Sequence, residues 1–186
     1  MSENTAQALV IVFDGIEEIE ALTPVDILRR AGVEVTVATL DGQASVTGRN
    51  QITFSADTSL PLLKDHSFEL VILPGGPGVL QLIESEPLRD LLLKQDSVGN
   101  QIAAICAAPK VLAQHGLLNK RQATSHISVR GDLPIPSEEA VVVDGHITTS
   151  QGLGTAVDFS LSLVKTLKGE AIAQEIADSI HYSPSA

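Results

Sequence analysis

The sequence has a single cysteine, no tryptophan and few basic residues, and each shortage excludes a class of protein. One cysteine cannot form an intramolecular disulfide or supply a cysteine-rich zinc or iron–sulfur site. With 3% aromatic residues, there is little to stack against bases. Twelve Lys and Arg against 23 Asp and Glu give a net charge of −11, which opposes phosphate binding. We therefore expect no nucleic-acid partner.

The sequence also lacks long hydrophobic runs, and we expect no targeting leader. No apolar stretch reaches the roughly 18 residues that a membrane-spanning helix needs, and the segment Met1–Gln7 is polar. We expect no membrane association. The free thiol suits a reducing compartment, which predicts a cytoplasmic protein. The 186 residues, 44% of them hydrophobic, can build one core, so we expect a single domain over residues 1–186.

Several apolar runs predict buried strands. Two runs, Ala8–Phe13 and Leu70–Leu73, are continuous and rich in β-branched residues. A third, Gln101–Ile105, has fewer branched residues, and Val33–Ala38 alternates. Continuous apolar runs of this length are typical of strands that are covered on both faces, as in a parallel sheet.

Helical patterns and turns separate these strands. Two hairpins are predicted, at Ala44–Phe54 around Gly48 and at Glu139–Ser150 with its turn at Asp144-Gly145. From apolar spacings of three and four residues, and from Pro or Gly at several ends, we predict helices at Ile19–Ala31, Pro87–Gln95, Pro109–His115, Thr155–Leu167 and Glu170–Ile180. Alternating strands and helices imply right-handed crossovers, and hence an α/β fold with helices around a mainly parallel sheet.

Ligands of such folds bind at the carboxyl ends of the strands, and Cys106 lies at one of these ends. It lies between a buried strand and a helix that Pro109 begins. Such a turn exposes its middle side chain, as in a nucleophile elbow, and the amide dipoles of the helix favour a thiolate. A cysteine is equally suited to packing as a small hydrophobe, so position alone leaves both interpretations open.

Two other predicted strand ends carry residues that could act with Cys106. The amides of Pro74–Gly78 could form an oxyanion hole, or the segment could be an ordinary tight turn. Three acids, Glu17, Glu18 and Glu20, crowd the start of the first helix, where they complement its dipole. One of them could instead face Cys106, where its pKa would rise and let it carry a proton. Spacing does not say which.

Among five histidines, His126 is the candidate for catalysis, because it follows a short segment after the Cys106 helix. His115 is expected to cap that helix, and the other three are expected in solvent. The histidines are dispersed, with no H-x-x-x-H pattern, so we expect no metal site.

Four motifs together resemble the ThiJ/PfpI superfamily, and within it the branch of the parkinsonism-associated protein deglycase and its bacterial relatives. The resemblance runs from about Ala8 to Ala177. The motifs that carry it are Ile102-Ala-Ala-Ile-Cys-Ala-Ala-Pro109, Leu73-Pro-Gly-Gly76, Glu17-Glu-Ile-Glu20 and Thr149-Ser-Gln-Gly-Leu-Gly-Thr155. Any one of these motifs would be weak evidence, whereas the combination is specific.

The resemblance implies a flavodoxin-like three-layer sandwich, a homodimer and a strained nucleophile elbow at Cys106. It assigns the role of the protonated carboxyl partner to Glu20 and matches His126 to a histidine near the site. The residues that it implies for oxyanion or substrate binding are the backbone groups of Gly75, Gly76 and Ala107, and the basic side chains of Arg30 and Arg49, which match residues near the site and the dimer contact in relatives.

The activities that the resemblance implies need no cofactor. They are conversion of methylglyoxal to lactate, of the glyoxalase III type, and repair of early glyoxal adducts on proteins and nucleotides. It also leaves open a redox sensor or chaperone that signals through oxidation of Cys106 to a sulfinate, and a role in thiazole or thiamine biosynthesis. Ala107 stands where the protease-like branches place His, and Ser128 stands where glutamine amidotransferases place an acid, so we expect neither peptidase nor glutaminase activity.

Overall fold

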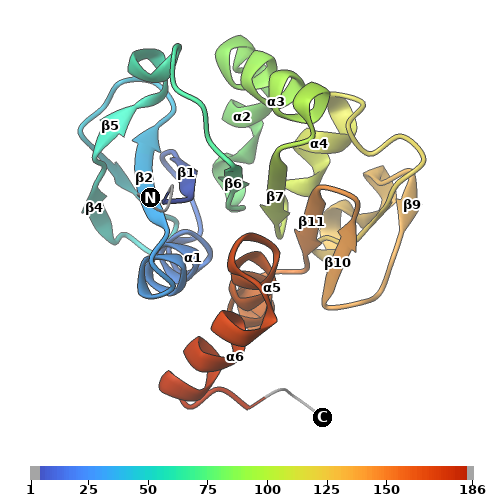
Figure 1. The fold of residues 1–186 in the computed structure, drawn as a ribbon. Helices are drawn as coiled ribbons and strands as arrows, with labels where there is room; N and C mark the ends of the chain where they lie inside the picture. Colours follow the sequence, from blue (N-terminus) through green and yellow to red (C-terminus); the bar gives the residue numbers. More distant parts are fainter. Residues whose placement is uncertain (1–4, 184–186) are drawn as a thin grey trace.

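The computed structural model describes residues 5–183 and is built around a seven-stranded sheet (Figure 1). The strand order is β10-β11-β7-β6-β1-β2-β5, and every neighbouring pair is parallel except β10 with β11. The strands are β1 (Gln7–Val12), β2 (Glu34–Thr39), β5 (Thr58–Ser59), β6 (Leu70–Leu73), β7 (Gln101–Ile105), β10 (Val141–Asp144) and β11 (Ile147–Ser150). The predicted α/β fold with a mainly parallel sheet is confirmed.

Helices cover both faces of this sheet. In Figure 1, α1 and α5 lie on one side of it, and α2, α3 and α4 lie on the other. Helix α6 packs against α5. The helices are α1 (Glu18–Arg30), α2 (Leu80–Glu84), α3 (Glu86–Val98), α4 (Pro109–Gln114), α5 (Ala156–Lys168) and α6 (Glu170–Ser179). All five predicted helices are present, and α2 is an addition that the sequence pattern did not predict.

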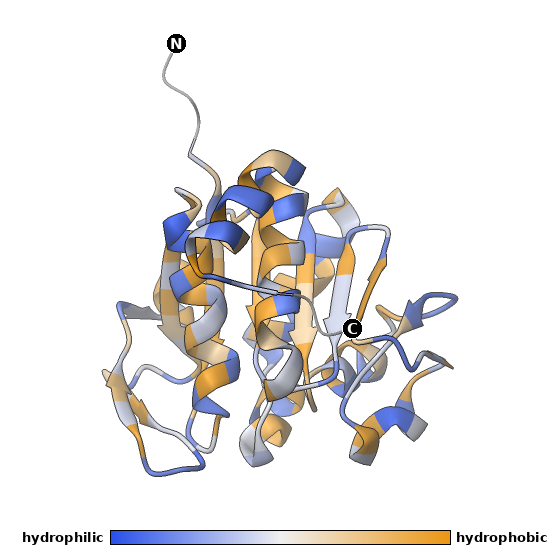
Figure 2. Ribbon diagram, turned by 90° about the horizontal axis from the view of Figure 1, so that it is seen from below, coloured by the Kyte–Doolittle hydropathy of each residue, from blue (hydrophilic) through white to orange (hydrophobic). Residues whose placement is uncertain are grey.

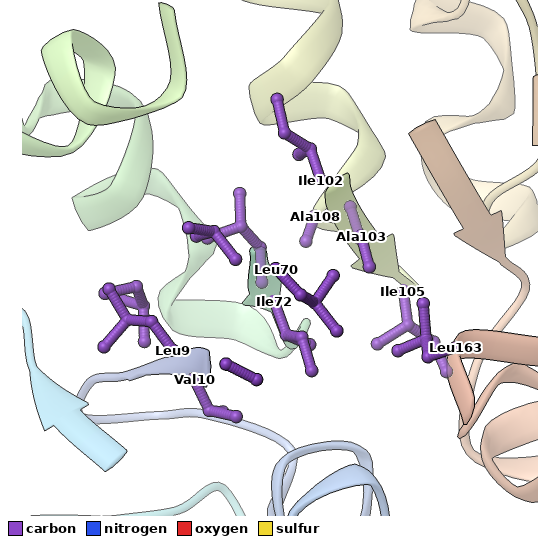
Figure 3. Packing of buried hydrophobic residues seen from close by; sticks show 14 of the residues in the cluster. Leu9, Val10, Leu70, Ile72, Ile102, Ala103, Ile105, Ala108 and Leu163 are labelled. Atoms are coloured by element: carbon purple, nitrogen blue, oxygen red, sulfur yellow. The ribbon is translucent and has the colours of Figure 1, made fainter. Parts of the chain in front are cut away.

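The core lies between the sheet and its two helical layers. All four residues of β6 are buried, as are the last four of β7. Figure 3 shows Ile72, Ile105 and Leu163 among the side chains that fill this core, and Figure 2 shows the hydrophobic residues gathered on the central strands. The interpretation of the continuous apolar runs as strands covered on both faces is therefore confirmed.

Both predicted hairpins are present, but only the first leaves the main sheet. β3 (Ser45–Thr47) and β4 (Thr53–Ser55) form the predicted hairpin. β10 and β11 form the second hairpin around Gly145, whose φ is +64°, and β11 continues the main sheet beside β7. A small parallel pair, β8 (Gln122–Ala123) and β9 (Ile135–Pro136), was not predicted.

The sheet topology brings distant loops to one edge. β1, β6, β7 and β11 run parallel, so their carboxyl ends lie together. The segments that leave these ends are Phe13–Glu17, Pro74–Gly76, Cys106–Ala108 and Gln151–Gly152, and they meet at that edge. Separately, no helix in the described part of the chain is both long and apolar enough to cross a membrane.

Candidate active site

Cys106 occupies the strained turn between β7 and α4. Its φ is +65°, a backbone conformation that costs a residue with a side chain about 1–2 kcal/mol. Two hydrogen bonds hold the turn: the Cys106 N–H donates to the carbonyl of Ser150 at 2.9 Å, and the Cys106 carbonyl accepts from the N–H of His126 at 2.8 Å. The residue is half-buried. Its thiol is therefore held at the edge of the sheet by backbone contacts on both sides.

Glu20 provides the carboxyl group that contacts this thiol. The residue is 1% exposed, and its Oε2 accepts a hydrogen bond from the N–H of Gly75 at 3.0 Å. The carboxyl group is also hydrogen-bonded to Cys106 and to the backbone of Leu153. Burial raises the pKa of Glu20 to about 7, against the opposing effect of these hydrogen bonds. Glu20 can therefore hold or release a proton beside the sulfur near neutral pH.

The thiol and the carboxyl group form a coupled pair. Burial raises the pKa of Cys106 to about 12, and the charge of ionised Glu20 adds to the effect. The amide of Ala107 donates to the sulfur and acts in the opposite direction, but burial and charge outweigh it. The Ala107 amide therefore acts in the predicted direction, and an ionised Glu20 acts against it. The thiolate instead forms when the proton passes from sulfur to Glu20, so the two groups titrate as one unit.

Gly75 and Gly76 approach the pair too closely for a side chain. A Cβ on Gly75 would lie 2.7 Å from the Cβ of Cys106 and 2.9 Å from Oε2 of Glu20. Gly76 has φ +120°, and a Cβ there would lie 2.4 Å from the carbonyl oxygen of Gly15. The Gly75 amide donates to Glu20, and its expected role in binding an oxyanion stays a prediction. The Gly76 amide donates no hydrogen bond to any of residues 5–183.

His126 brings its backbone to the site, while its ring is engaged elsewhere. The N–H of His126 binds the Cys106 carbonyl, as described above. The ring Nδ1 lies 2.8 Å from Oγ of Ser128 and accepts from the Ser128 N–H at 3.2 Å. The residue is exposed. The predicted proximity to Cys106 therefore holds for the chain, but the ring is bound to Ser128 and not to the thiol.

The two candidate arginines lie in different surroundings. Arg49 places Nε 3.5 Å from Oε2 of Glu17, a buried acid whose charge acts on both Glu20 and Cys106. Arg30 lies at the other end of α1, about 15 Å from Glu20 along the helix axis. It is exposed and donates from Nε to Asp26 at 2.8 Å. Within one chain Arg30 lies away from Cys106 and Glu20, and its expected place near the site and the dimer contact stays a prediction.

The segment after β11 closes the site, and residue-by-residue reasoning did not single it out. A Cβ on Gly152 would lie 3.6 Å from Oε1 of Glu20 and 3.9 Å from Sγ of Cys106. Thr155 fixes this segment, because its Oγ1 accepts from the Gly152 N–H at 3.2 Å and lies 2.7 Å from Oγ of Ser150. The rule that ligands bind at strand ends, applied to the predicted strand before Gln151, would have found it.

Comparison with known proteins gives a consistent result. Residues 6–166 match the DJ-1/PfpI family. Protein dj-1beta of Drosophila melanogaster is 42% identical over 178 residues, which cover 93% of this chain and 95% of the relative. A Caenorhabditis elegans protein named glutathione-independent glyoxalase DJR-1.2 is 32% identical over 173 residues, covering 91% of this chain and 92% of that protein.

Solved structures agree with these sequence matches. The crystal structure of Drosophila melanogaster DJ-1beta superposes with a TM-score of 0.93 at 40% identity, covering 97% of this chain and all of that one. The structure described as Toxoplasma gondii DJ-1, oxidized, gives a TM-score of 0.94 at 33% identity with the same coverage. These likenesses confirm the predicted flavodoxin-like three-layer sandwich. The chain, in its fold and over almost its whole length, belongs to the DJ-1/PfpI family.

Proposed function

We propose that this protein is a cofactor-independent cysteine enzyme that converts 2-oxoaldehydes to 2-hydroxy acids, as from methylglyoxal to lactate. One observation carries the proposal: a buried carboxyl group with a pKa of about 7 is hydrogen-bonded to a half-buried thiol. This pair supplies a nucleophile and a proton carrier, which are the two groups that the reaction needs. The C. elegans relative named as a glutathione-independent glyoxalase supports it.

The first step makes a bond to sulfur. The thiol proton passes to Glu20, and the thiolate of Cys106 attacks the aldehyde carbon. The carbonyl oxygen takes up the negative charge and then the proton from Glu20, which gives a hemithioacetal. The Gly76 amide is the candidate to stabilise this oxyanion, because the Gly75 amide is bound to Glu20 and the Ala107 amide to the sulfur.

The second step moves a proton between adjacent carbons. The carboxylate of Glu20 removes the proton from the former aldehyde carbon, and the electron pair moves toward the neighbouring ketone to give an enediol. Reprotonation at the second carbon yields the thioester of a 2-hydroxy acid. The first carbon is oxidised and the second is reduced, so no external oxidant or reductant is needed. Water then breaks the C–S bond, which releases the acid and returns the thiol.

Glu20 is a better proton carrier than His126 in this scheme. Its carboxyl group already contacts the sulfur, whereas the His126 ring is bound to Ser128. The same attack on carbon also applies to early adducts of glyoxals on amines and thiols of proteins and nucleotides. We propose this deglycation as a second use of the site, because such adducts are in equilibrium with the free aldehyde.

The environment of the thiol also favours a second candidate function, redox sensing. Cys106 is half-buried, and a protonated Glu20 can donate a hydrogen bond to an oxidised sulfur. Peroxide converts a thiolate first to a sulfenic acid and then to a sulfinic acid. The T. gondii relative has a structure described as oxidized. A sensor would use this oxidation as its signal, whereas an enzyme would lose its nucleophile by it.

We also propose that the protein is a cytoplasmic homodimer. A free thiol without a disulfide partner suits a reducing compartment. Four large apolar side chains are exposed near the start of α1, on this helix and on two segments that are hydrogen-bonded to Glu18 and Glu20. An exposed apolar patch of this kind favours association with a second copy. The four side chains are Ile19 (45% exposed), Leu22 (38%), Ile52 (51%) and Leu153 (52%).

The proposed reaction predicts which substitutions abolish turnover. In buffer with EDTA and without glutathione, Cys106→Ser and Glu20→Gln should each lower lactate production from methylglyoxal by about 100-fold or more, because each removes a group that takes part in every turnover. His66→Gln, in an exposed loop, is the matched control and should keep full activity. Full activity of Cys106→Ser would refute the mechanism.

The raised pKa of Glu20 predicts how stability depends on pH. The folded-state pKa of about 7 exceeds the ordinary value of 4.5, so Glu20 stabilises the fold below pH 4.5, and this contribution is lost as the pH rises through 7. The difference between these two pKa values corresponds to about 3 kcal/mol in the free energy of unfolding. Urea unfolding at pH 4.5 and 7.5 should show wild type losing that much relative to Glu20→Gln. If the free energies of unfolding of wild type and Glu20→Gln changed equally between the two pH values, the pKa of Glu20 would be ordinary.

Redox sensing predicts selective oxidation at one position. After mild peroxide treatment, mass spectrometry should find two added oxygen atoms at Cys106, because Glu20 hydrogen-bonds to the sulfinate. In Glu20→Leu, Cys106 should no longer yield the sulfinate selectively, because the carboxyl group that donates the hydrogen bond to it is lost. Equal sulfinate yields in wild type and Glu20→Leu would contradict the role of Glu20.

The apolar patch predicts the oligomeric state. Sedimentation equilibrium should give a mass of twice 19.6 kDa for the wild type. Ile19→Glu should shift it toward the monomer, because the charge would be buried at the contact. Leu62→Glu, at a side chain that is 73% exposed on another part of the surface, is the control and should stay dimeric. A monomeric wild type would refute the dimer.

A further inference from the structure

Glu18 is as buried as Glu20, yet the proposed reaction gives it no role. It is 1% exposed and accepts three hydrogen bonds, all from the loop between β3 and β4. The donors are the N–H of Asn50 at 2.8 Å, Nδ2 of Asn50 at 2.9 Å and the N–H of Ile52 at 3.4 Å. Burial acts to raise the pKa of Glu18, but the hydrogen bonds outweigh it and the pKa is lowered. An ionised carboxylate therefore fastens this loop to α1.

The loop is shaped to receive the carboxylate. A Cβ on Gly48 would lie 2.3 Å from both Cδ and Oε1 of Glu18, so a side chain there would displace the carboxylate. The loop turns tightly, with the Gly48 N–H donating to Ile52 and its carbonyl accepting from Gln51, which has φ +65°. The 48–52 loop thus wraps around one acidic side chain.

Arg49 connects this loop to the acids beside the thiol. Its N–H donates to the carbonyl of Ile16 at 2.8 Å, and its Nε lies 3.5 Å from Oε2 of Glu17. The other oxygen of Glu17, Oε1, is buried and has no hydrogen-bond partner among the described residues. The charge of Glu17 acts to raise the pKa of both Glu20 and Cys106. Arg49 is therefore the cation that offsets a charge close to the reacting pair.

We propose that Glu18 is a positioning residue for the reacting pair: it holds the 48–52 loop so that Arg49 stays on Glu17 and offsets its charge beside Cys106. The catalytic role of Glu18 rests on the proposed function. The contacts from Glu18 through the 48–52 loop to Arg49 and Glu17 do not depend on it. Glu18 acts through the loop and touches neither the sulfur nor a substrate.

Among residues 5–183 of one chain, three other charged or titratable side chains have partners of their own. The ring of His126 is bound to Ser128. In α4, Lys110 pairs with Asp132 at 3.1 Å. In the loop after β1, Asp14 accepts from the N–H of Thr47 at 2.8 Å. Within the described part of one chain, the electrostatic balance at Cys106 and Glu20 therefore depends on Glu17 and on the cation that Glu18 places against it.

The test measures the reactivity of the Cys106 thiol toward iodoacetamide as a function of pH. Without the Glu18 carboxylate the loop loosens, Arg49 leaves Glu17, and the unbalanced charge disfavours the thiolate. Glu18→Gln should therefore lower the alkylation rate, measured below the midpoint of the pH profile, by about three- to tenfold. Arg49→Met should give the same decrease, and the double variant no more than either single one.

Glu69→Gln is the matched control. Glu69 also accepts from a backbone amide, that of Gln7 at 2.7 Å, but at the opposite end of the sheet. It should leave the alkylation profile unchanged. A rate in folded Glu18→Gln equal to or above that of wild type, or a further decrease in the double variant, would overturn the proposal. If Glu18→Gln does not fold, Asn50→Ala takes its place, because it removes one of the three groups that donate to Glu18. Its alkylation rate is then compared with that of Arg49→Met and of the corresponding double variant.

The result is separable from the proposed activity, because iodoacetamide needs no substrate site. A wild type that alkylates as expected but makes no lactate refutes the enzyme and leaves the role of Glu18 standing. An active wild type whose alkylation is unaffected by Glu18→Gln refutes only the role of Glu18.

Discussion

The hydrogen bond between the Glu20 carboxyl group and the Cys106 thiol is the interaction on which the site depends. It joins the first turn of α1 to the turn after β7, and it lies where water is largely excluded. In such surroundings, two acidic groups cannot both ionise without a large electrostatic cost. One proton is therefore shared between oxygen and sulfur, and the chemistry of the protein follows from which atom holds it.

Keeping this pair together requires close packing of the backbone around it. Gly75 lies against both members of the pair so closely that a side chain there would displace them, and Gly152 packs on the pair at ordinary contact distance. The strained φ of Cys106 is held by hydrogen bonds to Ser150 and His126, which belong to two other segments of the chain. The parallel sheet makes this possible, because it delivers four strand ends to one edge. The rigid sheet thus supplies the precision that the loops alone would lack.

Much of the fold could be predicted because its signals are local. Buried strands such as β6 are continuous apolar runs, and Pro109 marks the start of a helix. The two-residue strands β8 and β9 are too short to show any periodicity, and five-residue α2 hardly more. Cys106 could be singled out from its place after a strand, whereas residue spacing left Glu20 undecided and the family resemblance was needed.

What could not be predicted depends on directions and surroundings. Successive positions on a helix point about 100° apart, so the three acids at the start of α1 face three different partners. Glu17 meets Arg49, Glu18 meets the 48–52 loop and Glu20 meets the thiol. The burial around the sulfur, which raises the pKa of Cys106 against the effect of the helix amides, is also invisible in the sequence. The rotation of the His126 ring toward Ser128 is likewise a tertiary detail.

Because of Ile19, the first turn of α1 faces both the reacting pair and the proposed dimer contact. Ile19 stands between Glu18 and Glu20 in the chain, but its side chain is exposed while theirs are buried. A second copy of the chain resting on Ile19 would press on the same backbone turn that carries the proton-holding carboxyl group. Binding equilibria that share a rigid element are reciprocal. Dimerisation and protonation of Glu20 would then be thermodynamically coupled. Diluting the protein would dissociate the dimer and thereby shift the pKa of its own reaction centre.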